Sequence, residues 1–444
     1  MIYLLAVVLL SASVLTARAM LGGGREKTPT PEPAASKPAP PQEPAPAESA
    51  VLPEPAEPAT KPAAPSVDPA PPSPGLPEEG RAVWVTRWNY RKPADVERIM
   101  KQVASANLNI VYFQVRGAGD AFYRSDYEPW AASLSGRLGK NPGWDPLSVA
   151  VESAHKHGLK LHAWINVYPL WYANQPAPPR TNPVSPYYRT NWRIAAGPMD
   201  GYYWGSPGNP SLQNHVYRVA TDIVTRYDVD GLHMDRVRYP SRNLAWDKAS
   251  RSAFTAADRS YRRSHPGKRL SRSSWQTGQV SGLVGRISKG VKAKKPHVQV
   301  SAAAWGIYRD KWGWGSSDGL RDFYQDGQGW MKKGYVDILA PMTYWKIKQT
   351  PPWGTLVKDF VANRGGAMVY PGIAVYKYRD DWREVVYQVR LARRIGAQGV
   401  SFFDYSSLEG RWDDLRRLYP KKAAAPGTQA PQTSPPAASE PGGE

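Results

Sequence analysis

Cysteine is absent from the 444-residue chain, so neither a disulfide nor a thiolate metal site can form. Acidic residues are scarce: 38 Asp and Glu stand against 58 Lys and Arg, which gives a formal net charge of +20. The absence of cysteine excludes a small disulfide-stapled protein. The excess of positive charge attracts polyanions, which include nucleic acid, anionic wall polymers and membrane surfaces.

Several motifs of common enzyme classes are also missing. The sequence has no G-x-S-x-G, no H-E-x-x-H and no P-loop, the signatures of serine hydrolases, zinc proteases and nucleotide-binding enzymes. The first apolar run continues as WVTRWNYRKP, which lacks the Gly-rich turn that binds a dinucleotide pyrophosphate. We therefore expect no cofactor and no bound metal.

Composition divides the chain into four parts. Residues 1–19 hold an apolar core followed by Ala17-Arg18-Ala19, a pattern typical of a signal peptide. Because no Lys or Arg precedes that core, a retained N-terminal membrane anchor is the alternative. Residues 20–80 and 421–444 are rich in Pro and Ala, and we expect a disordered tether and a disordered tail. The folded part is then 81–420, and the protein is expected to be exported to the periplasm or cell envelope, or secreted.

The folded part contains eight short apolar runs, most of them followed by a helical pattern. Strands that alternate with helices form parallel sheets with right-handed crossovers. Eight such units predict an α/β fold, a (β/α)8 TIM barrel with enlarged, aromatic-rich βα loops. An open doubly wound sheet is the alternative, disfavoured by the missing Gly-rich turn. The runs are 82–88, 109–120, 159–166, 229–234, 297–305, 336–345, 368–376 and 399–405.

The fourth run lies in the stretch YDVDGLHMDRVRYP, Tyr227 to Pro240. Strand side chains alternate between faces, so His233 and Asp235 are expected to point the same way. In a barrel, Asp235 stands at the C-terminal rim, where barrels of this kind place their active sites. The alternative is a structural aspartate that caps a loop or pairs with Arg236 or Arg238.

Carboxylates and aromatic side chains dominate the expected strand ends. Two facing carboxylates suffice to hydrolyse a glycosidic bond, because one protonates the leaving oxygen while the other attacks the anomeric carbon or activates water. The candidate catalytic acids are Asp120, Glu128, Asp235 and Asp404. The candidate substrate-binding residues are Arg116, His162, Trp164, Asn166, Arg236, Trp305, Tyr344, Trp345 and Tyr376.

Further aromatic residues follow the third and fifth runs. Their flat rings suit the apolar faces of sugars, and for any single ring the anchoring of its own loop is the alternative. They are Trp171, Tyr172, Tyr187, Tyr188, Trp192, Tyr202, Tyr203, Trp204, Trp312 and Trp314.

His162 has a competing interpretation as a metal ligand together with Asp120 and Asp235. No second histidine stands at ligand spacing within HAWIN. We therefore favour His162 as a core or substrate-binding residue.

Four blocks, in this order, resemble the bacterial glycosyl hydrolase-like 10 family: FQVRGAGDAFYRSDYEPW, GWDPLSVAVESAHKHGLKLHAWIN, YDVDGLHMDRVRYP and ILAPMTYW. The resemblance extends over nearly all of the core, from RAVWVTRW to FFDYSSL. It implies a (β/α)8 barrel and glycoside hydrolysis, and known members cut peptidoglycan glycan strands. The residues that match family-typical positions are Arg116, Asp120, His162, Asn166, Asp235 and Tyr344.

Two positions depart from the family pattern. Where the family tends to show an Asp pair, as in DDYFYP, this chain has Asp235 followed by Arg236. The family's HAWFNPYR becomes HAWINVYPL, which lacks the arginine. If the second Asp carries the chemistry in relatives, this protein is altered in activity or only binds glycan.

Three functions follow from these observations. The first is an exported glycoside hydrolase that acts on cell-wall (peptidoglycan-type) or other polysaccharide, with Asp235 as nucleophile or base and Asp120, Asp404 or Glu128 as the acid. The second is a catalytically altered, glycan-binding barrel tethered in the envelope. The third, a nucleic-acid binder, is suggested by charge alone and is not expected, because no known nucleic-acid motif is present.

Overall fold

The computed structural model describes residues 79–177, 179–180, 197–242 and 246–420. The predicted signal segment, most of the tether and the tail lie outside the described residues, as do Tyr187, Tyr188 and Trp192. Among the described helices, none combines the length and the apolar character needed to cross a membrane.

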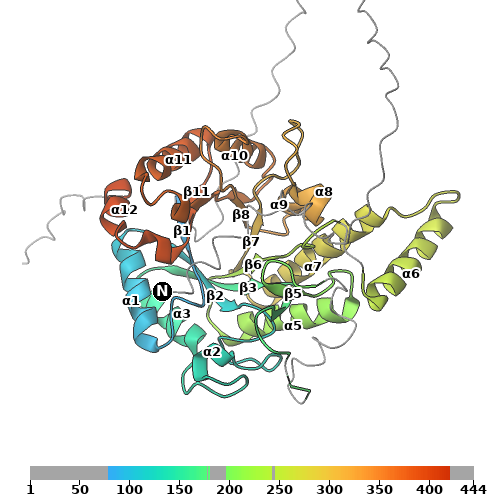
Figure 1. Ribbon diagram of the computed structural model, residues 1–444, viewed down its shortest axis with the longest axis horizontal. Coiled ribbons are helices and arrows are strands. Elements are labelled where there is room, and N and C mark those ends of the chain that lie inside the picture. The colour runs from blue at the N-terminus through green and yellow to red at the C-terminus, as the bar shows by residue number, and fades with distance from the viewer. Residues whose placement is uncertain (1–78, 178, 181–196, 243–245, 421–444) are drawn as a thin grey trace, which may run out of the picture. The chain divides into compact units, whose positions relative to one another are not determined.

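A parallel sheet forms the centre of the fold, and its strands run in the order β10-β11-β1-β2-β3-β6-β7-β8-β9 (Figure 1). Their bounds are β1 (Gly80–Val85), β2 (Ile110–Arg116), β3 (Lys160–Asn166), β6 (Gly231–Asp235), β7 (Gln299–Trp305), β8 (Ile338–Met342), β9 (Met368–Val369), β10 (Gly372–Ala374) and β11 (Gly399–Phe403).

The strands at the two ends of this order, β10 and β9, are consecutive in the sequence. β9 pairs with β8, and β10 pairs with β11, while only Tyr370 and Pro371 separate β9 from β10. Tyr370 N donates to Leu339 O at 2.9 Å, and Ser401 N donates to Pro371 O at 3.1 Å. The sheet therefore closes on itself as the predicted (β/α)8 barrel. Pro371, which has no N–H to donate, divides the predicted seventh strand into two short pieces.

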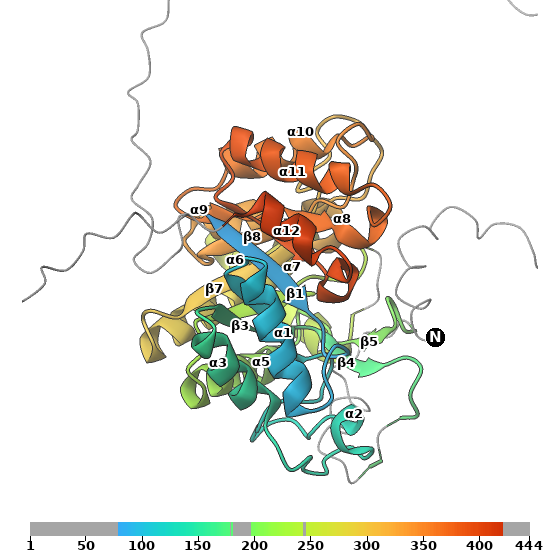
Figure 2. The ribbon, with the colours of Figure 1, turned by 90° about the vertical axis from the view of Figure 1, so that its left-hand side faces the viewer.

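Helices surround the barrel, as two views at right angles show (Figure 2). Several begin where the sequence supplies a cap and a proline: Asp145 accepts from Leu147 N and Ser148 N at the start of α3, and Asn209 accepts from two backbone N–H groups at the start of α5. The longer helices are α1 (Pro93–Ser105), α3 (Pro146–Lys156), α5 (Pro210–Arg226), α6 (Lys248–Ser264), α7 (Arg272–Lys294), α10 (Trp353–Ala362) and α11 (Trp382–Ile395). The short ones are α2 (Ala132–Ser135), α8 (Gly319–Phe323), α9 (Gly327–Lys332), α12 (Trp412–Leu418) and the 3-10 turns η1 (Val375–Lys377) and η2 (Tyr405–Leu408).

An antiparallel hairpin that the sequence analysis did not predict follows β3. It pairs β4 (Pro169–Tyr172) with β5 (Tyr202–Trp204). Gly119 N, in the loop after β2, donates to Leu170 O at 2.9 Å, and Gly205 N donates to Tyr168 O at 2.8 Å. The hairpin thus joins the loops that leave β2 and β3, on the side where these parallel strands end.

The barrel interior contains polar groups as well as apolar ones. Trp84 Nε1 donates to His233 Nε2 at 3.0 Å, and both His233 Nδ1 and His162 Nδ1 lie within 3.0 Å of Ser301 Oγ. The ring of Tyr112 stacks on His233 with its centroid 4.0 Å away. Because the indole donates to Nε2 of His233, the proton of that imidazole is on Nδ1 and points to Ser301. Ser301 then has its own hydroxyl proton to donate to His162.

Candidate active site

The C-terminal ends of the strands place a set of acids and aromatic rings around one opening. In register, Asn166 of β3 pairs with Asp235 of β6, Trp305 of β7 with Met342 of β8, and Ala374 of β10 with Phe403 of β11. Parallel strands end on the same edge, so the residues just beyond these pairs stand at one level of the barrel. The mouth of the barrel, as used below, consists of Asp235, Trp305, Tyr344, Trp345, Tyr376, Phe403 and Asp404, all of them partly exposed.

Tyr344 lies near both carboxylates of the mouth. Burial raises the pKa of its hydroxyl well above the usual value, and Tyr376 and the charges of Asp235 and Asp404 raise it further. A phenol that is influenced by both carboxylates must lie near each of them. Tyr344 is therefore a neutral phenol near two acids, one at the end of β6 and one just beyond β11.

Each of these two acids has a different set of hydrogen bonds. Asp235 Oδ1 accepts from Arg236 N at 2.6 Å, and Oδ2 has no hydrogen bond from the described residues. Asp404 Oδ1 accepts from Ser407 Oγ at 2.6 Å and from Ser407 N at 3.2 Å, while Oδ2 accepts from Ser406 Oγ at 2.9 Å. Asp404 is thus held in a fixed orientation by its own turn, whereas one oxygen of Asp235 remains open to a ligand.

Aromatic rings line the space between these acids. The Tyr344 centroid is 5.7 Å from Phe403 and 6.4 Å from Tyr376, and Tyr376 is 6.3 Å from Phe403. Across the mouth, the indole N–H of Trp305 donates to Ser317 O at 2.8 Å, which fixes the ring. Faces of this kind suit the apolar C–H surfaces of a sugar ring, and the two carboxylates of the mouth are the groups that could act on its glycosidic bond.

Arg236 does not neutralise Asp235. Its backbone is left-handed, with φ of 50°. Its Nη1 lies 3.1 Å from Asp200 Oδ2, and its Cζ lies 4.9 Å from the centroid of the Tyr202 ring. Arg238 Nη2 also lies 3.1 Å from Asp200 Oδ2. Neither guanidinium forms an ion pair with Asp235 among the described residues, so the pairing alternative is not observed. The capping alternative stays open, because Oδ1 accepts from the backbone N–H of Arg236 in the following loop.

Asp120 is a buried acid beside the mouth. The hydroxyl of Tyr172 lies 3.0 and 3.1 Å from its two oxygens, and Ala118 N donates to Oδ1 at 3.2 Å. Burial raises the pKa of this carboxyl above its usual value, although Arg87 and the Tyr172 hydroxyl act in the opposite direction. Because Asp120 is enclosed beneath β4, we assign it to anchoring Tyr172 of the hairpin and balancing the charge of Arg87, and not to direct contact with substrate.

Arg116 and Glu128 form a closed pair, far more buried than the sequence analysis expected. Arg116 Nη2 lies 2.7 Å from Glu128 Oε1, and His215 Nε2 lies 2.9 Å from the same oxygen. Both side chains of the arginine–glutamate pair are fully buried. Burial alone would raise the pKa of Glu128, but Arg116 and His215 hold it below its usual value. A carboxylate kept ionised in this way cannot supply a proton, so we assign this pair to the support of the β2 and β3 loops.

Trp164 and Asn166 are also buried: Asn166 is the register partner of Asp235, and Trp164 stands one layer deeper, beside His233. Asn166 Oδ1 accepts from Trp164 Nε1 at 3.2 Å and from Gln114 Nε2 at 3.4 Å, and its amide donates to Gly117 O at 2.9 Å. Gln114 Oε1 in turn accepts from Arg87 Nη1 at 2.9 Å. These buried side chains form a hydrogen-bonded network next to the mouth and are not among its exposed residues.

His162 belongs to the barrel core, as one of the two interpretations of the sequence anticipated. Burial lowers its pKa to about 4, and its ring packs so closely on Gly231 that a Cβ there would lie 2.4 Å from Nδ1. The metal alternative through Asp120, His162 and Asp235 is not supported by this placement. Among the described residues, no three His, Asp or Glu side chains come together in a way that could hold a metal ion.

Asp200, Arg87 and Phe403 are parts of the site that the sequence analysis did not name, and Arg238 was considered there only as a partner of Asp235. For Asp200, the sequence does contain a recognisable turn motif. Asp200-Gly201 is a two-residue turn, with φ of 52° and 78°, between Met199 and Tyr202, whose backbones exchange hydrogen bonds of 2.8 and 3.0 Å. An Asp-Gly pair is a strong hairpin signal, and this one was overlooked.

Residues 79–362 match the model of the family described as glycosyl hydrolase-like 10. Among characterised relatives, the glycosyl hydrolase YngK of Bacillus subtilis (strain 168) is 28% identical over 398 residues, which cover 78% of this chain and 73% of the relative. The glycosyl hydrolase DigH of Escherichia coli (strain K12) is 28% identical over 327 residues, 66% of this chain and 70% of the relative.

Solved structures show the same fold. The glycoside hydrolase domain of PgaB (BpsB) from Bordetella bronchiseptica superposes with a TM-score of 0.58 at 13% identity, over 78% of this chain and 100% of that one. The catalytic domain of a β-amylase from Paenibacillus polymyxa has a TM-score of 0.50 at 12% identity, over 74% of this chain and 93% of that one. At these identities the likeness concerns the barrel and not the site.

Proposed function

The chain belongs to the glycosyl hydrolase-like 10 family, and from this premise we propose that it is an exported glycoside hydrolase that cleaves glycosidic bonds in a cell-wall polysaccharide of the peptidoglycan type. The single observation that carries the proposal is that Asp235 and Asp404 both stand near Tyr344, at the strand ends that form the mouth of the barrel. The names of the relatives and the aromatic walls of the mouth support a glycan as the ligand.

The two acids have distinct roles in this proposal. Asp235, with one oxygen free of described partners, acts as nucleophile or general base on the anomeric carbon or its attacking water. Asp404, oriented by Ser406 and Ser407, is the second carboxyl group of the pair, and in its protonated form it gives its proton to the leaving oxygen. Tyr344 stays protonated and donates a hydrogen bond as negative charge shifts between the carboxylates.

The closing test measures reducing ends released from purified glycan strands, with and without their peptides. Asp235→Asn and Asp404→Asn are each expected to lower the rate by about 10²- to 10⁴-fold, the usual contribution of an acid or base. Asp228→Asn is the matched control, because Asp228 is an exposed acid that lies 3.7 Å from Lys295, outside the mouth. Full activity in either mouth variant, with the fold intact by circular dichroism, removes that acid from the mechanism.

One observation favours a second candidate function, a glycan-binding barrel without hydrolysis. Arg236 stands where the family tends to show a second Asp, and its guanidinium turns toward Asp200 and Tyr202. The same experiment decides between the two. Wild-type protein that retains glycan on a pull-down but releases no reducing ends would support the binding function.

Export and the anionic character of the substrate are parts of the same proposal. The signal-like segment 1–19 and the net charge of +20 support a location among anionic wall polymers. Fractionation of cells that express the full chain tests the location. Recovery of the protein in the cytosolic fraction alone would contradict export.

A further inference from the structure

The excess positive charge of the chain is concentrated in one part of the fold. Residues 247–295, which contain α6 and α7, hold thirteen Lys and Arg but two acids, so more than half of the net charge of +20 lies there. Both acids are engaged locally: Asp247 caps α6 through Ser250 N, and Asp258 binds Arg262 and Leu270 N. In Figure 1, α6 lies at the periphery, farther from the strands than α7.

α6 presents its basic side chains as one stripe. Lys248, Arg251, Arg259, Arg262 and Arg263 recur at helical spacing and are exposed. The opposite face carries Phe254, which packs against Trp275 of α7 at 5.5 Å. At 1.5 Å per residue, the stripe from Lys248 to Arg263 is about 22 Å long, which is enough for several units of an extended polymer.

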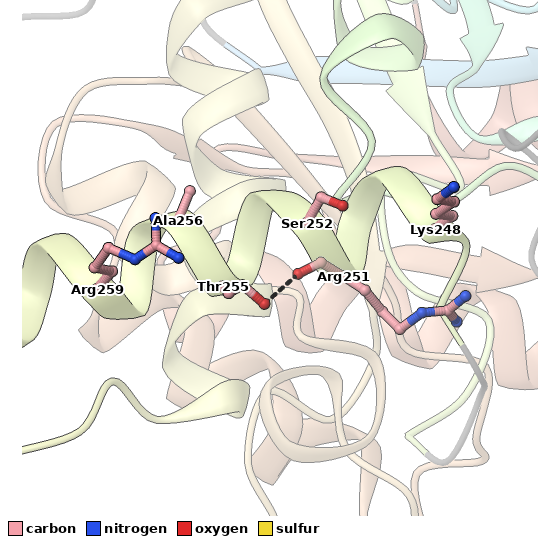
Figure 3. Close-up of a pocket in the computed structure, with 6 residues that line it drawn as sticks. All are labelled: Lys248, Arg251, Ser252, Thr255, Ala256 and Arg259. Carbon is pink, nitrogen blue, oxygen red and sulfur yellow. Dashed lines mark hydrogen bonds between the residues drawn. The ribbon is translucent and has the colours of Figure 1, made fainter.

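Small side chains between the basic ones leave two adjoining hollows along the helix, and Figure 3 shows the residues that line the first of them. The first, of about 320 Å³, is lined by Lys248, Arg251, Ser252, Thr255, Ala256 and Arg259. The second, of about 370 Å³, is lined by Thr255, Arg259, Arg262 and Arg263. Lys248, Arg259 and Arg263 have no acid partner among the described residues, so their charges are available to a ligand.

From these observations we infer that the α6 stripe is a second binding surface, separate from the barrel mouth, for a linear anionic polysaccharide that carries carboxylate or phosphate groups. The choice of a glycan over other polyanions rests on the proposed function. Arginine, which supplies four of the five basic groups, binds such oxyanions with paired N–H donors. A surface of this kind keeps the enzyme on its polymer between cleavage events at the mouth.

The composition of the stripe argues against two other occupants. The exposed large apolar side chains of the described chain are Trp88, Trp312 and Tyr387, and none lies on α6, so the helix has no apolar anchor for a bilayer interior. Nor does the stripe offer an exposed aromatic ring for stacking on nucleic-acid bases.

The test compares two triple variants with equal loss of charge. Lys248→Gln, Arg259→Gln and Arg263→Gln remove the free charges of the stripe. Lys358→Gln, Arg390→Gln and Arg394→Gln remove the same number of exposed charges from α10 and α11. The probe is fluorescently labelled polygalacturonate, a linear carboxylated polysaccharide, and its affinity for the full chain is measured by anisotropy over a range of salt concentrations.

The stripe variant is expected to bind the polymer at least about tenfold more weakly, with a shallower salt dependence because fewer counterions are released. The control variant is expected to stay within about twofold of wild type. Equal losses in the two variants would overturn the inference, because general charge would then explain binding. Tighter stripe-dependent binding to phosphatidylglycerol vesicles or to duplex DNA than to polygalacturonate would overturn the choice of a polysaccharide.

The outcome is separable from that of the proposed hydrolase function. Binding to polygalacturonate requires no bond cleavage, and Asp235→Asn is expected to leave it unchanged. If wild-type protein released no reducing ends from any glycan, a tenfold loss in the stripe variant would still establish the binding surface.

Discussion

At the scale of single residues, the interior histidines make folding stability depend on pH. Burial lowers the pKa of His162 to about 4 and that of His233 well below its usual value, whereas Asp230 and Asp337 act in the opposite direction on His162. An unfolded imidazole takes up its proton near pH ~6.5. Between pH 6.5 and 4 the unfolded chain therefore binds more protons than the folded chain, and stability falls as pH falls.

For His162 alone the expected loss of unfolding free energy across this window is about 3 kcal/mol, at about 1.4 kcal/mol for each unit of pKa difference. Urea unfolding at pH 7 and at pH 4.5 measures it. His162→Gln is expected to be less stable at both pH values but to show a shallower dependence on pH. The control is His297→Gln, at an exposed position, and a slope equal to wild type in the His162 variant would contradict the assignment.

The same residues show what the sequence could and could not reveal about the site. The period-two alternation of β6 placed His233 inside the barrel and Asp235 at its rim. The depth of a side chain along a strand was harder to judge, because it depends on the register with neighbouring strands. Arg116, Trp164 and Asn166 were expected to contact substrate, yet all three are buried. Arg116 is hydrogen-bonded to Glu128, Trp164 to Asn166, and Asn166 to Gln114 and Gly117.

At the scale of elements, the β4–β5 hairpin is held to the barrel by a shared carboxylate. Asp200, just before β5, binds Arg236 and Arg238 from the loop after β6 at 3.1 Å each. Burial alone would raise the pKa of Asp200, but the two guanidinium groups hold it below its usual value. The position of Arg236 beside the mouth thus depends on a residue of another loop.

Asp200→Asn is expected to release Arg236 and loosen the hairpin. The unfolding free energy should fall by about 1 kcal/mol, the usual value for a partly exposed ion-pair network. The substitution displaces Arg236 beside the mouth but leaves the proposed catalytic acids in place. KM for glycan strands should therefore rise by about three- to tenfold with little change in kcat. Asp381→Asn, which breaks an outer pair with Arg383 at 3.4 Å, is the control. An unchanged KM together with unchanged stability would show that the hairpin is held by other contacts.

The order of the strands was predictable, whereas the hairpin and the short helices were not. Each barrel strand is a buried apolar run and is recognised by its composition alone, as β2 and β11 illustrate. β5 is three aromatic residues long, and α8 and α9 are five and six residues long. Segments this short have too little periodicity to be recognised, and tertiary contacts determine their conformation.

At the scale of the whole molecule, the barrel closes between the first and last strands of the described chain. β1 pairs with β2 on one side and with β11 on the other. Glu79 Oε1 lies 2.7 Å from Arg393 Nε, and Asn107 Nδ2 donates to Tyr419 O at 3.1 Å. Residues 79–420 thus contain every contact that completes the barrel.

A fragment of residues 79–420 is therefore expected to unfold with a free energy within about 0.5 kcal/mol of that of the full chain. A fragment that begins at residue 86 lacks β1 and therefore loses its pairing with β2 and with β11. This fragment is expected not to fold. Denaturant unfolding followed by tryptophan fluorescence measures both. Marked destabilisation of the longer fragment would mean that residues outside 79–420 contribute to the barrel.

The parallel barrel also determines on which side the chain enters and leaves. Gly80 begins β1 beside Gly399 at the start of β11, so the first described residues lie at the pole opposite the acids that end the strands. Tyr419, which Asn107 holds just before β2, leaves from that pole as well. For a fragment of residues 79–420, a purification tag or a solid support attached at either end would consequently leave the opening unobstructed, and the fragment immobilised on beads should act on soluble glycan as readily as in solution.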